Sequence, residues 1–239
     1  PNMARVKELV TQDAAIKGIW CVPKYSNPTG NTYSNKVVEQ FAEISKVAGD
    51  NFTVFWDNAY AVHDLVEEGD ELPSLMTAAE KAGTTDSIVM LGSTSKVTFA
   101  GAGISFLATS TLQLAAFEKF LSNQMIGFDK VNQLRHVRFL KDSDGIKAHM
   151  AKHRDIVKPK FDLVLTRLEE HLAGKSMASW NSPHGGYFIS LDTRPGLATT
   201  IIKMAADAGV KLTPAGATFP YGKDPENTNI RLAPTFPGL

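Results

Sequence analysis

A lysine follows a short apolar run and stands beside two serines. Residues 88–91 are apolar, and residues 92–96 then read Gly-Ser-Thr-Ser-Lys. A lysine held in a partly desolvated cleft has a lowered pKa and can attack an aldehyde. We therefore expect Lys96 to act as a nucleophile, with the hydroxyls of Ser93 and Ser95 beside it. A surface lysine that follows a strand is the alternative interpretation of this motif alone.

Three other stretches contain groups that could act with Lys96. Residues 26–30 read Ser-Asn-Pro-Thr-Gly, residues 57–60 read Asp-Asn-Ala-Tyr, and residues 229–231 read Asn-Ile-Arg. Taken singly, the first is typical of a turn, the aspartate of a turn or a helix cap, and the arginine of a surface ion pair. Their occurrence together in one chain favours a shared chemical role.

The elements that must position these groups alternate between strands and helices. Apolar runs bounded by turn residues predict strands at 18–22, 52–56, 87–91 and 104–108, and helical periodicity predicts helices at 4–10, 35–47 and 74–82. This alternation predicts an α/β fold with an open, mainly parallel sheet, which binds ligands beyond the carboxyl ends of its strands. Asn27, Asp57 and Lys96 all follow predicted strands, so we expect them at this edge.

The second half of the chain has a different pattern. Helical rhythm extends from 112 to 174 and includes a long helix over 147–172, with a kink or a break expected at Pro159. Beyond it we expect strands at 176–180, 186–191, 210–213 and 229–232 and a helix at 199–208. We therefore predict that residues 1–145 are part of a large domain. Residues 146–239 would form a linking helix and an incomplete, smaller α+β domain.

Composition and charge exclude several classes of protein. The 239 residues contain 25 lysines and arginines and 25 aspartates and glutamates, so the net charge is zero. Without a basic stretch we expect no nucleic-acid partner, and without a long apolar stretch we expect no membrane partner. Cys21 is the only cysteine, which excludes intrachain disulfides and fits a reducing, cytoplasmic location. His63, His136 and His153 have no metal-ligand spacing, so we expect no metal.

Both ends of the sequence look interrupted. Residues 1–5 resemble the middle of a domain, and residues 235–239 stop just after a strand-like run. We therefore expect that further sequence belongs at each end of the protein.

The motifs above occur in the order and the approximate spacing of a known family. The chain resembles the fold-type I, class I/II aminotransferases, which use pyridoxal 5'-phosphate, over nearly all of its length. Residues 22–30, 56–60 and 95–103 are most similar to a bacterial aspartate aminotransferase subgroup. The resemblance implies the large domain of these enzymes, followed by their small domain.

The resemblance also implies a role for each of the cofactor-contacting residues. Lys96 would be the catalytic residue, which links to the aldehyde of the cofactor and then moves the substrate proton. Asp57 would pair with the protonated pyridine nitrogen, because a nearby cation keeps a carboxylate ionised. Tyr60 and Asn27 would donate hydrogen bonds to the phenolic oxygen of the cofactor.

Phosphate and substrate would be bound by other groups. By the resemblance, Ser93 and Ser95 hold the phosphate, while Arg231, together with Asn27, binds the α-carboxylate of the substrate. Most relatives carry an arginine for the phosphate about eight residues after the lysine. This sequence has Ala-Gly-Ala-Gly-Ile-Ser at 100–105 instead. We expect the backbone of this small-residue run to approach the phosphate.

The activity implied is transfer of an amino group between aspartate and 2-oxoglutarate, in two half-reactions of ping-pong order, by a homodimer active in amino-acid metabolism. An aminotransferase of aromatic or alanine specificity is one alternative. The effector-binding domain of a transcription regulator, which would hold the cofactor without turnover, is another. The cation for the side-chain carboxylate of aspartate is not evident, and Lys130, Arg135 and Arg138 are weak candidates.

Overall fold

The computed structural model describes residues 1–238 and divides into two compact units. Unit 1 consists of Pro1–Lys24, Thr32–Ala61 and Glu71–Lys147, and unit 2 consists of Tyr25–Asn31, Val62–Asp70 and Ala148–Leu239. Two short segments of the first half of the chain thus belong to unit 2. A single boundary along the sequence cannot describe that division, and the domain limits drawn above at 145 and 146 stay a prediction.

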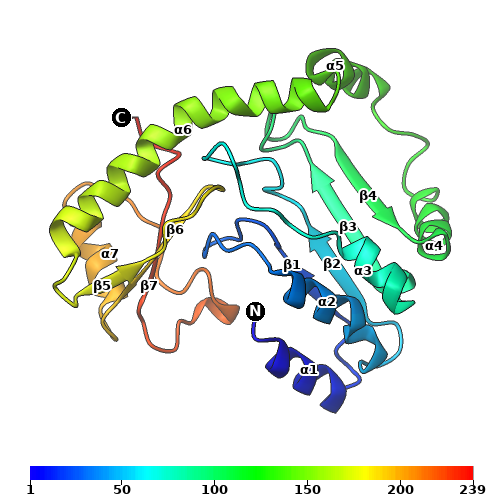
Figure 1. The fold of residues 1–239 in the computed structure, drawn as a ribbon, viewed down its shortest axis with the longest axis horizontal. Helices are drawn as coiled ribbons and strands as arrows, with labels where there is room; N and C mark the ends of the chain where they lie inside the picture. The colour runs from blue at the N-terminus through cyan, green and yellow to red at the C-terminus, as the bar shows by residue number, and fades with distance from the viewer. Residues whose placement is uncertain (239) are drawn as a thin grey trace. The chain divides into compact units, whose positions relative to one another are not determined.

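Unit 1 is built on a four-stranded sheet. Its strands, in spatial as well as sequence order, are β1 (Gly18–Cys21), β2 (Thr53–Asp57), β3 (Ile88–Ser93) and β4 (Ser105–Thr109). The first three run parallel, and β4 is antiparallel to β3 (Figure 1). The prediction of a mainly parallel α/β sheet is therefore confirmed. The carboxyl ends of β2 and β3 lie side by side, because Asp57 pairs with Leu91.

Helices cover one face of this sheet. They are α1 (Met3–Gln12), α2 (Asn35–Glu43), continued by the 3₁₀ turn η1 (Ile44–Lys46), and α3 (Leu75–Ala82). Alternate strand residues such as Val54 and Trp56 face these helices and are fully buried, whereas Phe55 points to the other face. A left-handed glycine, Gly83 (φ +70°), ends α3 and leads through η2 (Thr85–Ser87) into β3.

The remaining helices of the first half are α4 (Thr111–Leu121) and α5 (Lys130–Leu140). The long helix α6 (Ser143–Leu172) begins in unit 1 and continues into unit 2. It runs through Pro159 without interruption, so the predicted break is absent. Proline removes one hydrogen bond from a helix, but Val157 and Phe161 on either side pack against Ile189 and hold the helix together across that position.

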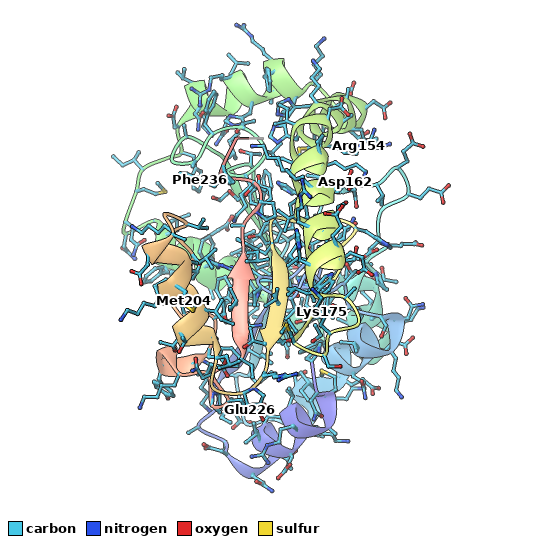
Figure 2. All side chains as sticks on the ribbon, turned by 90° about the vertical axis from the view of Figure 1, so that its left-hand side faces the viewer. Arg154, Asp162, Lys175, Met204, Glu226 and Phe236 are labelled. Atoms are coloured by element: carbon cyan, nitrogen blue, oxygen red, sulfur yellow. The ribbon has the colours of Figure 1, made fainter. Side chains whose placement is uncertain are left out.

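Unit 2 contains a three-stranded antiparallel sheet of β5 (Ala178–Trp180), β6 (Ile189–Thr193) and β7 (Asn229–Leu232). Helix α6 and helix α7 (Ala198–Asp207) pack on it through two apolar clusters. Figure 2 shows β6 and β7 between α6, which carries Arg154 and Asp162, and α7, which carries Met204. This arrangement confirms the α+β character expected for the second half.

The prediction of a strand at 210–213 is wrong. This segment has no regular secondary structure and belongs to neither sheet, and η3 (Pro220–Gly222) is the next regular element. The Val210 N–H bonds back to the carbonyl of Ala205 at 2.8 Å and so ends α7 instead of joining a ladder. Pro214 then lacks the N–H that a ladder would require. Among residues 1–238, no helix combines the length and the apolar character needed to cross a membrane.

Candidate active site

The ends of β2 and β3 bring together two of the predicted residues. Asp57 is the last residue of β2, and Ser93 is the last residue of β3. The N–H of Asn58 donates to the carbonyl of Leu91 at 2.9 Å, which keeps the two strands paired up to this edge. Because both strands are parallel, their carboxyl ends present Asp57 and Ser93 at the same edge of the sheet, as the sequence predicts.

The carboxylate of Asp57 is oriented by a tryptophan that the sequence analysis missed. Trp20 donates from Nε1 to Oδ2 of Asp57 at 3.2 Å, and its ring stacks on Phe55 with centroids 5.4 Å apart. Trp20 is 60% exposed, although it lies within an apolar run. The two-residue period of a strand was the available signal: it places Trp20 on the face opposite the buried Cys21.

Ser93 and Ser95 form a tight pair of hydroxyls. Their Oγ atoms are 2.7 Å apart, and the N–H of Ser95 donates to Oγ of Ser93 at 3.0 Å. The small-residue run lies directly against them, since a Cβ added to Gly103 would be 2.8 Å from the nitrogen of Ser95 and 2.9 Å from its Oγ. A larger residue at 103 would therefore displace the serines. The approach of this backbone to a bound phosphate stays a prediction.

Lys96 follows this pair and is exposed rather than partly desolvated, which corrects the environment expected from its sequence. Its Nζ lies 4.9 Å from the centroid of the Tyr60 ring, and Tyr60 itself is only 4% exposed. A cation over an aromatic face is attracted by the ring electrons. The structure thus places Tyr60 beside the amine of Lys96, although the two residues lie on different connections of the sheet.

Helix α5 supports the loop that carries Lys96. Asn132 and Arg135 both donate to the carbonyl of Ala102, at 3.2 and 3.0 Å. The buried His136 has Nε2 2.8 Å from Oγ1 of Thr98, two residues after the lysine. Arg135, considered above as a cation for the substrate, is therefore engaged with the backbone of this loop.

A second group of predicted residues lies within unit 2. Arg231, on β7, donates from Nη1 to Oδ1 of Asn27 at 3.0 Å and from Nη2 to Oγ1 of Thr213 at 3.1 Å. Its guanidinium carbon lies 4.4 Å from the ring centroid of Phe188. The Nε atom is buried and, among the described residues, has no hydrogen-bond partner. Arginine can donate five hydrogen bonds, so donors remain for a carboxylate.

The loop of Asn27 is anchored by Tyr25, which lies two residues before it. Tyr25 is 1% exposed, donates to Asp64 at 2.5 Å and accepts from the N–H of Asp70 at 2.9 Å. Burial, reinforced by the acceptor Asp64, raises the pKa of its hydroxyl far above the usual value. Tyr25 is therefore a structural anchor within unit 2. Thr213 and Phe188 beside Arg231 carry no local sequence signal that would have identified them.

In the part of the chain that the structure describes, no three His, Cys, Asp or Glu side chains cluster as a metal ion would require. Unit 1 presents hydroxyls, an amine and a carboxylate after its strands, and unit 2 separately presents an amide and a guanidinium, groups that suit organic anions.

Comparison with known proteins agrees with the resemblance. The sequence profile of the aspartate amino-transferase family matches residues 1–239. A Mycolicibacterium smegmatis protein whose name assigns it to the aminotransferases is 49% identical over 239 residues, which are 100% of this chain and 56% of that protein. The aspartate aminotransferase of Corynebacterium glutamicum is 44% identical over 237 residues, or 99% of this chain and 54% of the relative.

The fold agrees with the sequence match. The crystal structure of an aspartate transaminase from Corynebacterium glutamicum superposes with a TM-score of 0.96 at 43% identity, over 99% of this chain and 55% of that one. The chain spans about half the length of the relatives it matches. By its sequence over residues 1–239, this chain belongs to the aspartate amino-transferase family.

Proposed function

We propose that the full-length protein is a pyridoxal 5'-phosphate-dependent aminotransferase that acts on aspartate and 2-oxoglutarate. The gathering of Asp57, Ser93, Ser95 and Lys96 at the ends of β2 and β3 is the observation that carries this proposal. The name of the relative from Corynebacterium glutamicum supports aspartate as the substrate.

The donor set suits this cofactor. A phosphate requires hydroxyl and N–H donors, and Ser93 and Ser95 supply two hydroxyls 2.7 Å apart. A pyridine nitrogen that is to stay protonated requires a carboxylate, which Asp57 supplies. When bound, pyridoxal phosphate supplies an aldehyde for an amine and a ring that accepts electrons from the substrate. The set has no arginine for the phosphate, so the charge on the phosphate would be balanced by other parts of the full-length protein.

Each residue then has a defined task. Lys96 would hold the cofactor through its aldehyde, and its free amine would move the proton of the substrate Cα. Its flexible four-carbon stem allows the same nitrogen to do both. Asp57, oriented by Trp20, would keep a proton on the pyridine nitrogen. Tyr60, buried beside Lys96, would donate to the phenolic oxygen of the cofactor, as would Asn27.

Arg231, with Asn27, binds the α-carboxylate of the amino acid and of the 2-oxo acid. The buried Nε of Arg231 supports this role, because a buried N–H without a partner costs free energy that a bound carboxylate would recover. Thr213 and Phe188 fix the plane of the guanidinium, so that its donors are oriented before substrate arrives.

We further propose a homodimer in the cytoplasm. Exposed apolar residues on α5, among them Val131 (80% exposed) and Val137 (63%), support association, because such residues are usually covered. Cys21, the only cysteine, is buried and unpaired, which supports a reducing location.

The test uses the purified full-length protein with pyridoxal phosphate. Aspartate should change the absorbance of the bound cofactor, and oxaloacetate should form in a coupled assay when 2-oxoglutarate is added. Borohydride reduction should attach the cofactor to the peptide that contains Lys96, and Lys96→Ala should bind the cofactor without turnover. Attachment at another lysine would reject the catalytic assignment.

Two further outcomes decide between the alternatives. A change in the absorbance of the bound cofactor with aromatic amino acids or alanine, but not with aspartate, would show that aspartate is not the substrate and would favour the other specificity. Tight cofactor binding without turnover of any amino acid would favour the effector domain of a transcription regulator.

A further inference from the structure

We infer that Asn181 is a positioning residue that sets the geometry of Asn27 and Arg231. Its kinetic consequence rests on the proposed function, because these two residues are proposed to bind the substrate carboxylate. All of the contacts that support the inference lie within unit 2.

Asn181 directly follows β5 and extends the pairing of β5 with β6. Its backbone N–H donates to the carbonyl of Ser190 at 3.1 Å. In return, the N–H of Ser190 donates to Oδ1 of Asn181 at 2.7 Å. The side-chain amide oxygen therefore takes the place of a backbone carbonyl, and Asn181 is fixed to β6 by two hydrogen bonds.

The other half of the same amide holds the loop of Asn27. Nδ2 of Asn181 donates to the carbonyl of Thr29. That loop is closed on itself, since the N–H of Gly30 donates to the carbonyl of Ser26 at 2.6 Å and the N–H of Ser26 donates to Asn31 at 3.1 Å. A hydrogen bond at Thr29 therefore positions the whole loop, including Asn27.

Packing at Gly30 shows independently that the loop lies against Asn181. A Cβ added to Gly30 would be 2.7 Å from Nδ2 of Asn181 and 2.7 Å from Cβ of Pro183, closer than side chains tolerate. Gly30 also has φ +65°, which favours glycine. The loop thus has no free space in which to shift toward β5.

These contacts form a closed ring with Arg231. Ser190, which Asn181 holds, pairs with Arg231 across β6 and β7. Arg231 in turn donates to Asn27, in the loop that Asn181 also holds. Asn181 is thus connected to Arg231 through the sheet and to Asn27 through the loop, so it determines how the two face each other.

Only a side chain with one acceptor and one donor can accept from the N–H of Ser190 and also donate to the carbonyl of Thr29. Asn181→Asp keeps the size and the acceptor for Ser190, but it places a carboxylate oxygen against the carbonyl of Thr29, where both atoms are acceptors. The hydrogen bond to Thr29 is then lost, and two acceptors face each other in its place. We therefore expect the loop to move away and the hydrogen bond between Asn27 and Arg231 to break.

The kinetic test uses the full-length protein with pyridoxal phosphate. Asn181→Asp should raise KM for both amino acid and 2-oxo acid about tenfold, with kcat changed less than about twofold and cofactor absorbance unchanged. When Arg231 is already Lys, the same change should raise KM by less than about twofold, because the two residues act on one contact. Unchanged KM in the single variant, or fully additive effects in the double variant, would overturn the inference.

A matched control is available in the same unit. Asn227 accepts from the N–H of Thr199 at 3.0 Å at the start of α7, and Asn227→Asp keeps that acceptor. This variant should leave both KM values unchanged. A KM rise equal to that of Asn181→Asp would show a general response of the unit and would overturn the inference.

A structural measurement separates this inference from the proposed function. Crystal structures of the wild type and of Asn181→Asp should show the 3.0 Å contact between Arg231 and Asn27 only in the wild type. Retention of that contact in the variant overturns the inference, whatever the activity. Absence of transamination by the wild type rejects the proposed function. In that case the two crystal structures alone decide whether Asn181 positions Asn27 and Arg231. If Asn181→Asp does not fold, Asn181→Ala removes the same donor and is read in the same way.

Discussion

Trp20 donates its indole N–H to the carboxylate of Asp57 at 3.2 Å, between adjacent parallel strands. Trp20→Phe keeps an aromatic ring for stacking on Phe55 but removes this donor. Because the bond is exposed, we expect kcat to fall about fivefold, equivalent to about 1 kcal/mol, in the coupled oxaloacetate assay. Unchanged kcat would show that Asp57 needs no support from Trp20.

Removal of the Asp57 carboxylate itself should lower kcat far more than removal of the Trp20 donor. Asp57→Ala leaves the pyridine nitrogen without a counter-ion, so kcat should fall by two to three orders of magnitude, or roughly 3–4 kcal/mol. Asp86→Asn serves as a control, since Asp86 is exposed in the same unit, and it should have normal kcat. Near-normal turnover by Asp57→Ala would contradict the assigned role.

Arg231→Lys tests the proposed carboxylate clamp. The substitution keeps the charge but loses the planar fork, so KM for both aspartate and 2-oxoglutarate should rise roughly tenfold or more while cofactor absorbance is retained. Arg194→Lys is the matched control, because Arg194 is exposed and donates to the carbonyl of Ser176. A fall in Tm with unchanged KM would instead indicate a packing role for Arg231.

Asp224 makes stability depend on pH. Desolvation of its carboxyl favours the neutral form, but hydrogen bonds from the N–H groups of Asn229, Thr228 and Glu226 outweigh it and hold the pKa below the usual value. Since the folded-state pKa is lowered, the stabilisation is complete above the unfolded pKa of about 3.9 and is lost as pH falls through the folded value.

Asp224→Asn should therefore lower Tm by about 2–4 °C at neutral pH, for a loss of about 1 kcal/mol. The difference in Tm between the variant and the wild type should become smaller as the pH is lowered through the acid range. Asp207→Asn, at an exposed position on α7, should show neither effect. A difference in Tm that is the same at every pH would contradict a role for the ionised carboxylate.

Cys21 should be unreactive in the folded protein. It is 2% exposed, and burial raises the pKa of its thiol to about 12. Since the thiolate is the reactive form, labelling by a chromogenic disulfide at neutral pH should be at least roughly a hundredfold slower than in denaturant. Labelling of the native protein at the rate of a small free thiol would contradict this burial.

Local patterns predicted the strands of unit 1 well. Apolar runs between turn residues located β1, β2 and β3, and the rule for parallel sheets then placed Asp57 and Ser93 at one edge. The segment 210–213 reads Val-Lys-Leu-Thr, an alternation that is also typical of a strand, but its hydrogen bonding is decided by the end of α7 and by Pro214. Composition alone could not separate these two cases.

The anchoring of the Asn27 loop could not be predicted. Tyr25 and Asp64 are 39 residues apart, and Asn181 and Thr29 are 152 apart, so their contacts exist only after the chain has folded. No local spacing indicates such pairs. The same holds for Trp20, whose polar nitrogen matters only because β2 places Asp57 beside it.

The interleaving of segments in unit 2 has a consequence for the order of folding. The N–H of Leu65 bonds to His184, and the N–H of Gly186 bonds to His63, so 62–70 depends on chain made more than a hundred residues later. During synthesis, therefore, the contacts of 62–70 can form only after the chain around 184–186 has been made. Such non-local contacts slow folding. A polypeptide of residues 148–239 alone would also lack Asp64 and His63, the partners of Gly185 and Gly186.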